Sequence, residues 1–305
     1  MKLLKMDFPL SIFIGIFLMG SIGCAEESEA IKMDNLFAWC IIPYDAKERN
    51  TEERIAMLQK LGIESYAIDW RDEHLDILAD EIVAARENDI DVEAMWLWVD
   101  NTNQPDSLNE TNERVLAAVD STDIETTFWL GINSNFFEGL SMEASMDKLK
   151  RLIAYLDDRA QALDCKLALY NHGDWFGEPM NMVKVLSQLQ DRNVGIVYNF
   201  HHAHPQLEDL EANIKAMLPY LVAVNLNGMN PDGPKILPIG KGSEEKQMIE
   251  KVLNAGFTGP FGILGHVEDR DVELVLQENL DGLKDLGFVA NDLDTKNIET
   301  LLLRK

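Results

Sequence analysis

The stretch KLALYNH, residues 166–172, is an apolar run that ends in an asparagine and a histidine. Segments of helical periodicity separate it from similar runs on either side. Apolar strands that alternate with helices predict a parallel sheet covered on its outer face, and eight such units predict a single-domain α/β fold, the (β/α)8 TIM barrel. The other seven runs are LFAWCII (36–42), SYAIDW (65–70), VEAMWLWV (92–99), TTFWLGI (126–132), VGIVYNF (194–200), LVAVNLN (221–227) and FGILGH (261–266).

Helix boundary signals support this count. The segments 51–62, 243–256 and 271–287 each begin with a residue that can cap a helix N-terminus, and each ends at a glycine. A doubly wound open sheet is the alternative. It is disfavoured because PYDAKERN follows the first run, where a glycine-rich phosphate-binding turn would be needed.

The N-terminus predicts export. Lys2 and Lys5 precede an apolar segment that is too short to span a membrane comfortably, and small residues and Cys24 follow it. The sequence SIGC resembles the lipobox of bacterial lipoproteins, in which the cysteine is lipidated. We therefore expect a lipoprotein signal peptide (1–23), lipidation at Cys24, a tether (24–34), the barrel (35–290) and a C-terminal tail (291–305). An ordinary cleaved signal peptide with an incidental Cys24 is the alternative.

Composition limits the partners. The 305 residues include 53 acidic and 27 basic side chains, which give a formal net charge of −26. A surface this acidic repels phosphate backbones and anionic headgroups, so we expect no nucleic acid partner and membrane contact only through a lipid anchor. The expected location is therefore the periplasmic or outer-membrane side. Cys40 and Cys165 fall at opposite ends of predicted strands and are expected to be unpaired.

Five of the six histidines follow predicted strands. In a parallel barrel, residues at the carboxyl ends of the strands face one common mouth. Imidazoles titrate near neutrality and bind divalent metals, so this gathering predicts a catalytic or ligand site. Alternatively, polar residues simply mark where strands end. The five are His172, His201, His202, His204 and His266.

Amide and aromatic side chains share the same position, whereas paired carboxylates of the kind found in glycosidases are not evident there. Amides bond sugar hydroxyls, and indoles stack on the apolar face of a sugar ring. A small carbohydrate is therefore the expected partner. The expected substrate-binding residues are Asp69, Arg71, Trp96, Trp98, Asn171, Trp175, Asn199, Asn225 and Asn227.

Four motifs, in order, carry a family resemblance: LYNHG (169–173), YNFHHAH (198–204), VNLNGM (224–229) and LPIGKG (237–242). The chain resembles, over about residues 35–287, the sugar phosphate isomerase/epimerase family of xylose-isomerase-like TIM barrels, in an exported lipoprotein branch. The resemblance implies one divalent metal held by a glutamate, an aspartate, a histidine and a glutamate at the ends of strands five to eight.

The motif positions of this chain depart from that ligand set. Tyr170, Asn199 and Asn225 stand where the first three ligands are expected, and Gly265 and His266 lie near the fourth. Imidazoles favour borderline metals over hard ones. If a metal is bound, it is expected to be zinc, cobalt or manganese, with His172, His202 and His266 as ligands.

The resemblance also implies proton transfer beside a carbonyl group, for which His202, His204 and Lys241 are the expected acid/base residues. The expected function is an exported enzyme acting on a neutral sugar or keto-sugar derivative. It would be an isomerase or epimerase, or a lyase or hydratase of 3-keto-glycosides. The alternative is a non-catalytic carbohydrate-binding lipoprotein that has lost the metal site of the family.

Overall fold

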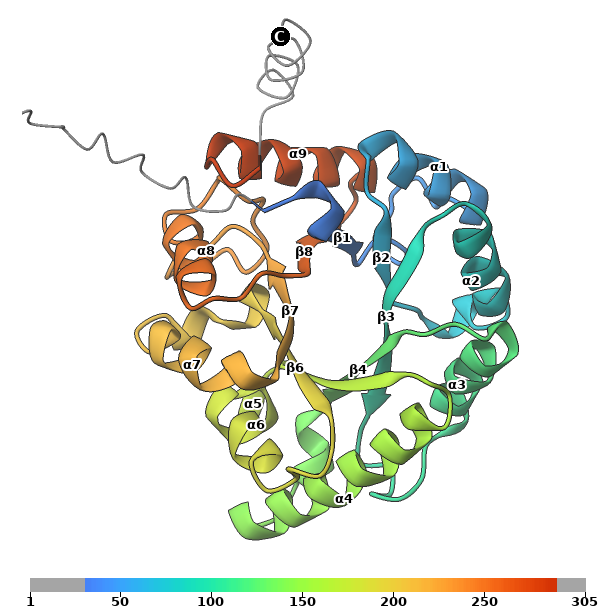
Figure 1. Cartoon of the computed structure of the whole chain (residues 1–305), viewed down its shortest axis with the longest axis vertical. Coiled ribbons are helices and arrows are strands. Elements are labelled where there is room, and N and C mark those ends of the chain that lie inside the picture. The colour runs from blue at the N-terminus through green and yellow to red at the C-terminus, as the bar shows by residue number, and fades with distance from the viewer. Residues whose placement is uncertain (1–30, 290–305) are drawn as a thin grey trace, which may run out of the picture.

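The computed structural model describes residues 31–289, which form a closed barrel of parallel strands inside a ring of helices (Figure 1). The strands lie side by side in chain order, and the last one pairs with the first, which confirms the predicted (β/α)8 barrel. The strands are β1 (Leu36–Trp39), β2 (Ser65–Ile68), β3 (Asp91–Val99), β4 (Thr127–Ile132), β5 (Lys166–Tyr170), β6 (Val194–Asn199), β7 (Leu221–Leu226) and β8 (Phe261–Leu264).

Helices follow the strands and cover the outside of the barrel. They are α1 (Thr51–Leu61), α2 (Leu78–Glu87), α3 (Glu110–Thr122), α4 (Met142–Gln161), α5 (Asp174–Gly177), α6 (Pro179–Leu186), α7 (Leu210–Met217), α8 (Glu245–Asn254) and α9 (Val272–Asp285). Within residues 31–289, no helix is long and apolar enough to span a bilayer. The predicted segments 1–23 and 291–305, with Cys24 and most of the tether, lie outside the described residues.

Local signals set the element boundaries. Helix α1 begins at Thr51 and ends at Gly62, which has φ +67°, as expected. The capping residue is Asn50 rather than Thr51, because the Asn50 side chain forms a capping box with Glu53. Helix α8 begins two residues later than expected, because the N–H of Ser243 donates to the Met229 carbonyl and Ser243 belongs to the preceding turn. Four of the eight strands, β1, β2, β5 and β8, end two or three residues before the apolar runs do.

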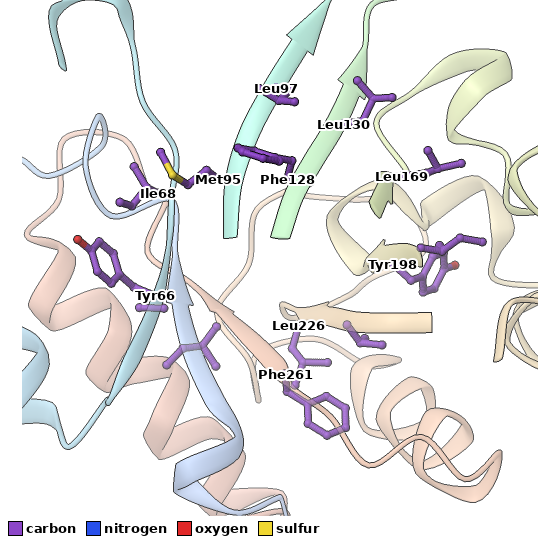
Figure 2. Close-up of a cluster of buried hydrophobic side chains, with 14 of the residues drawn as sticks. Tyr66, Ile68, Met95, Leu97, Phe128, Leu130, Leu169, Tyr198, Leu226 and Phe261 are labelled. Carbon is purple, nitrogen blue, oxygen red and sulfur yellow. The ribbon is translucent and has the colours of Figure 1, made fainter. Parts of the chain in front are cut away.

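The outward side chains of the strands form the larger core. Tyr66, Leu97, Phe128, Tyr198 and Phe261 belong to this layer, and all are buried between the strands and the surrounding helices (Figure 2). Each fully buried side chain of this size contributes about 1.5 to 3 kcal/mol through removal of its apolar surface from water.

A smaller aromatic cluster fills the inside of the barrel. Trp39, Trp96, Trp129 and Tyr170 occupy it, alternating with alanines on the neighbouring strands. The fit is tight at Gly131, where an added Cβ atom would lie 2.4 Å from the Trp98 ring. Large rings therefore fit inside because small residues face them.

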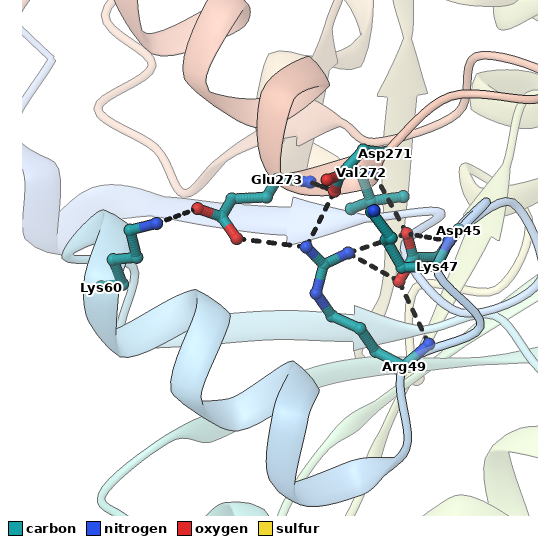
Figure 3. A network of polar contacts seen from close by, with 7 residues as sticks. All are labelled: Asp45, Lys47, Arg49, Lys60, Asp271, Val272 and Glu273. Atoms are coloured by element: carbon teal, nitrogen blue, oxygen red, sulfur yellow. Dashed lines mark hydrogen bonds and ion pairs between the residues drawn. The ribbon is translucent and has the colours of Figure 1, made fainter.

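Charged residues join the first and last β/α units. Figure 3 shows Asp45, in the loop after β1, accepting hydrogen bonds from the N–H groups of Lys47 and Val272, each at 3.2 Å. The Arg49 guanidinium binds both Asp45 oxygens at 2.8 Å. Burial alone would raise the pKa of Asp45, but these hydrogen bonds together hold it below its ordinary value.

The same Arg49 extends the network to the start of α9. It lies 2.8 Å from Asp271, which caps that helix, and 3.1 Å from Glu273, which also pairs with Lys60 of α1. We call these residues the seam network. It ties the β1–α1 loop to α9 where the barrel closes.

The two expected unpaired cysteines are confirmed. Cys40 follows β1 at the mouth, Cys165 precedes β5 at the other end of the barrel, and both are free thiols.

We predict that Arg49→Gln lowers the free energy of unfolding by about 3 kcal/mol at pH 7, because it leaves the buried Asp45 carboxylate without its ion pair. The matched control is Arg114→Gln, which breaks an exposed pair with Asp76 and should cost less than about 1 kcal/mol. Urea denaturation of the three proteins measures both values. Equal losses in the two variants would contradict the role of the seam network.

The contribution of the Asp45–Arg49 ion pair to the free energy of unfolding should depend on pH. The folded-state pKa of Asp45 lies below its unfolded value of about 4, so its stabilisation is present above that pH and disappears as the pH falls through the folded-state value. The difference between wild type and Arg49→Gln should therefore shrink in acid. A difference that stays constant from pH 7 to pH 3 would argue against this linkage.

Candidate functional site

A buried acid lies at the end of β2 in the mouth, the end of the barrel where the strands terminate. Asp69 is only 4% exposed, and neither carboxylate oxygen has a hydrogen bond of ordinary geometry from the described residues. The Cys40 thiol and the N–H groups of Ile42 and of Asp69 itself are nevertheless close enough to lower its pKa. Burial raises the pKa of Asp69 to about 7, against the opposing effects of the Arg71 charge and the Cys40 thiol. A carboxyl group that titrates near neutrality can both accept and return a proton.

Arg71 is held beside this acid. Its guanidinium donates to the Tyr44 hydroxyl and to the Trp70 carbonyl, each at 2.8 Å. The Tyr44 ring in turn stacks on His266, with ring centroids 3.4 Å apart, and His266 contacts Glu268 at 2.9 Å. His266 is therefore positioned by residues of the β1 and β8 loops.

The remaining mouth histidines gather after β5 and β6. The ring centroid of His202 lies 4.7 Å from those of both His172 and His201. Burial lowers the pKa of His202 to about 2 and that of His201 to about 3, with smaller contributions from neighbouring charges. Burial also lowers the pKa values of His172 and His204. These imidazoles are neutral at pH 7, and the low pKa of His202 makes it better suited to hydrogen bonding than to accepting a proton.

The lysine of the mouth differs from the expected one. Lys241 is exposed, and its charge acts on Glu278 of α9, on the outside of the barrel. Lys235, in the same loop between β7 and α8, instead lowers the pKa values of the histidines described above. The loop turns between these two positions, which places Lys235 at the mouth and Lys241 away from it.

The four asparagines have different surroundings. Asn171 is a structural link: its side chain donates to the Asn199 carbonyl at 3.2 Å and accepts from the Asn199 N–H at 2.7 Å. Asn225 is fully buried, and neither polar atom of its side chain has a partner in residues 31–289. Asn227 donates to the Gly228 carbonyl at 2.7 Å, and its side-chain oxygen likewise lacks a partner there.

The three tryptophans predicted to bind a sugar lie in two different parts of the structure. Trp96 lies inside the barrel, 4.8 Å from Trp129 between ring centroids, and Trp98 meets His172 edge-on at 4.9 Å. Trp175 packs against Phe137 and donates to the Met142 sulfur, in the outer core rather than in the inner cluster. Trp175 is therefore placed apart from the other two predicted stacking residues.

The structure does not form the expected metal site. Across residues 31–289, no group of three or more His, Cys, Asp or Glu side chains could hold a metal ion. Of the three predicted ligands, His172 and His202 contact each other, whereas His266 stacks on Tyr44, so the described residues do not form one group from all three and the ligand set stays a prediction.

The residues at the implied ligand positions do not fit a hard divalent cation either. Burial raises the pKa of Tyr170 well above its ordinary value, so its phenol stays neutral. Asn199 and Asn225 are neutral amides. A divalent cation there would gain no negative charge from these three ligand positions.

Sequence reasoning missed several mouth residues. Trp39 contributes a buried indole N–H with no partner among the described residues, and Tyr44 and Cys40 lie around Asp69 and Arg71. All three lie at or just after the end of β1, so the rule that selected the other strand ends could have found them. Lys235 had no such signal, because periodicity does not encode the path of a long loop.

No family model and no curated protein matches the sequence. Among solved structures, the chain is similar to the 3-keto-D-glucoside 4-epimerase YcjR from E. coli, with a TM-score of 0.63 and 12% identity over 82% of this chain and 99% of that one. It is similar to a D-psicose 3-epimerase, with a TM-score of 0.60 and 15% identity over 83% and 97% of the two chains.

A third similar structure is a xylose isomerase-like TIM barrel protein from Mycobacterium smegmatis in complex with magnesium. Its TM-score is 0.53, at 14% identity over 82% of this chain and 96% of that one. What these three proteins share with this chain is the fold. The expected likeness to xylose-isomerase-like TIM barrels is thus confirmed for the fold.

We predict that the imidazoles of His201 and His202 remain neutral between pH 8 and pH 4.5, because burial disfavours their charged forms. Ring ¹⁵N shifts in NMR spectra measure this directly, and single His→Gln variants assign the signals. Unchanged backbone amide spectra over the same range serve as the control for folding. Protonation of either ring with a midpoint near 6.5 would contradict the neutral assignment.

Proposed function

We propose that the protein is an isomerase- or epimerase-like enzyme that transfers a proton beside the carbonyl group of a neutral sugar or keto-sugar derivative. The observation that carries the proposal is Asp69: a buried carboxyl group in the mouth, with a pKa near 7 and no hydrogen bond of ordinary geometry from the described residues to either oxygen. Two proteins with the same fold are named as a 3-keto-D-glucoside 4-epimerase and a D-psicose 3-epimerase, which supports this substrate class.

In the proposed step, the Asp69 carboxylate removes the acidic C–H proton next to the carbonyl, and the carbonyl oxygen takes on negative charge. Strand β2, which Asp69 directly follows, lies opposite β6 in the order of the closed barrel. A sugar in the mouth would thus meet the base on one side and the neutral imidazoles of His172 and His202 on the other. These imidazoles can hydrogen-bond sugar hydroxyls, while Trp98 offers an apolar surface beside them.

The same first step serves a lyase or hydratase of 3-keto-glycosides, since the keto group acidifies the neighbouring C–H bond. A sugar-binding protein without catalysis is the second candidate, because the amides and indoles would serve binding equally well. The titration of Asp69 near neutrality favours an enzyme, since binding of a neutral sugar requires no such group.

We predict that wild-type protein in D₂O exchanges the carbon-bound proton beside the keto group of its substrate, and that Asp69→Asn slows the exchange about 100-fold or more. Proton NMR with a panel of keto-sugars and their 3-keto-glycosides follows the loss of the C–H signal. Asp76→Asn, an exposed change, is the control and should leave the exchange rate unchanged. Exchange at the wild-type rate in Asp69→Asn would refute the assignment of the base, and sugar binding without any exchange would point to the binding protein.

We also propose that the protein is exported and anchored by lipid at Cys24, which lies outside the described residues. Support comes from the apolar N-terminal segment followed by SIGC. Mass spectrometry of the native protein should find a lipid-modified N-terminal cysteine, and Cys24→Ser should release the protein into the soluble fraction. Recovery of an unmodified chain that begins at another residue would exclude the anchor.

A further inference from the structure

Three neutral polar residues lie next to one another on the inner wall of the mouth. Tyr170 ends β5, Asn199 ends β6, and Asn225 lies near the end of β7. Asn199 and Asn225 are register partners on adjacent parallel strands, and the Tyr170 hydroxyl contacts the Asn199 side chain at 2.6 Å. All three are buried.

The hydrogen bonds of Asn199 leave the Tyr170 proton free. The Asn199 side-chain oxygen accepts from the His201 N–H at 3.0 Å, so its amide nitrogen faces Tyr170 and donates to the phenol oxygen. Burial raises the pKa of Tyr170 well above its ordinary value, and the phenol therefore retains its own proton. That proton is available for a further acceptor in the mouth.

Asn225 offers a second unused donor. Its side chain is fully buried, and no residue in the described part of the chain pairs with its nitrogen or its oxygen. Gly262 on β8 leaves room for this amide, since a Cβ atom there would lie 2.4 Å from the Asn225 side-chain oxygen. Buried polar groups are normally paired, so an unpaired amide in a ligand-binding mouth indicates that the ligand completes its hydrogen bonds.

We propose that Tyr170 and Asn225 form an oxyanion site of neutral hydrogen-bond donors, with Asn199 as the positioning residue. The site binds the oxygen that becomes negatively charged when the sugar enolises. This inference rests on the proposed proton transfer and places neutral hydrogen-bond donors at the positions where the family resemblance implies ligands of a divalent metal. Buried donors aimed at a developing negative charge stabilise it strongly because little water screens them.

The step is balanced without a further reactant. Asp69 accepts the proton of the C–H bond, the electron pair of that bond forms the carbon–carbon double bond, and the carbonyl π electrons move to the oxygen. The Tyr170 O–H and the Asn225 N–H donate hydrogen bonds to this oxyanion without transferring their protons. Return of the proton from Asp69 to carbon restores the carbonyl group.

The test measures binding without turnover. Erythronohydroxamate is a four-carbon sugar hydroxamate whose planar pair of oxygens resembles an enediolate. We expect wild type to bind it in the presence of EDTA by calorimetry, and added manganese or zinc to leave the affinity unchanged within twofold. Tyr170→Phe and Asn225→Leu should each weaken binding at least tenfold, whereas erythritol, which lacks the planar pair, should bind all proteins alike.

Two controls separate this role from a structural one. Tyr198→Phe removes another buried phenol, which bonds Gln206 outside the barrel, and should bind the hydroxamate as wild type does. Asn225→Leu replaces an unpaired polar side chain by an apolar one of similar size, so its melting temperature should equal or exceed that of wild type.

Several outcomes overturn the inference: no hydroxamate binding by wild type in EDTA, binding that requires added metal, or wild-type affinity in both variants. Wild-type affinity in both variants overturns the oxyanion site even if Asp69→Asn abolishes proton exchange. Conversely, tenfold losses in the two variants support the site even if no substrate undergoes exchange, in which case the proposed function fails by itself.

Discussion

The small volume inside an eight-stranded barrel is the constraint on which the rest of this structure depends. Five large aromatic side chains, Phe37, Trp39, Trp96, Trp129 and Tyr170, occupy that volume. They fit because the positions facing them are small, as at Gly131, where any side chain would collide with Trp98. The filled interior leaves no room for further large groups below the mouth, so the polar residues of the inner wall lie at the strand ends.

The aromatic side chains inside the barrel also influence the pKa values of the residues at the mouth. Apolar rings beneath Asp69 and the histidines exclude water, and this desolvation is the largest cause of the raised pKa of Asp69 and the lowered pKa of His202. The raised pKa of Asp69 and the lowered pKa of His202 thus have the same physical cause, which is burial. The acidic surface of the chain plays little part in this balance, because its charges lie in water.

Sequence patterns predicted the barrel because strands buried on both faces read as continuous apolar runs, and capping residues such as Asp271 mark helix starts. They predicted the identity of most mouth residues for the same reason. They did not predict which residues titrate, since burial of His202 depends on packing from several elements. They predicted Lys241 and missed Lys235, because the path of a loop is set by tertiary contacts rather than by its own residues.

The direction of the strands has a consequence for access to the site. All eight strands run toward the mouth, so the chain enters β1 at the opposite end of the barrel, where Asn35 bonds the Thr258 carbonyl in the loop before β8. The end of the barrel at which the chain enters β1 is therefore the end opposite the mouth. Contacts made at that end would leave the mouth open, so that small molecules could diffuse into it from the surrounding solution.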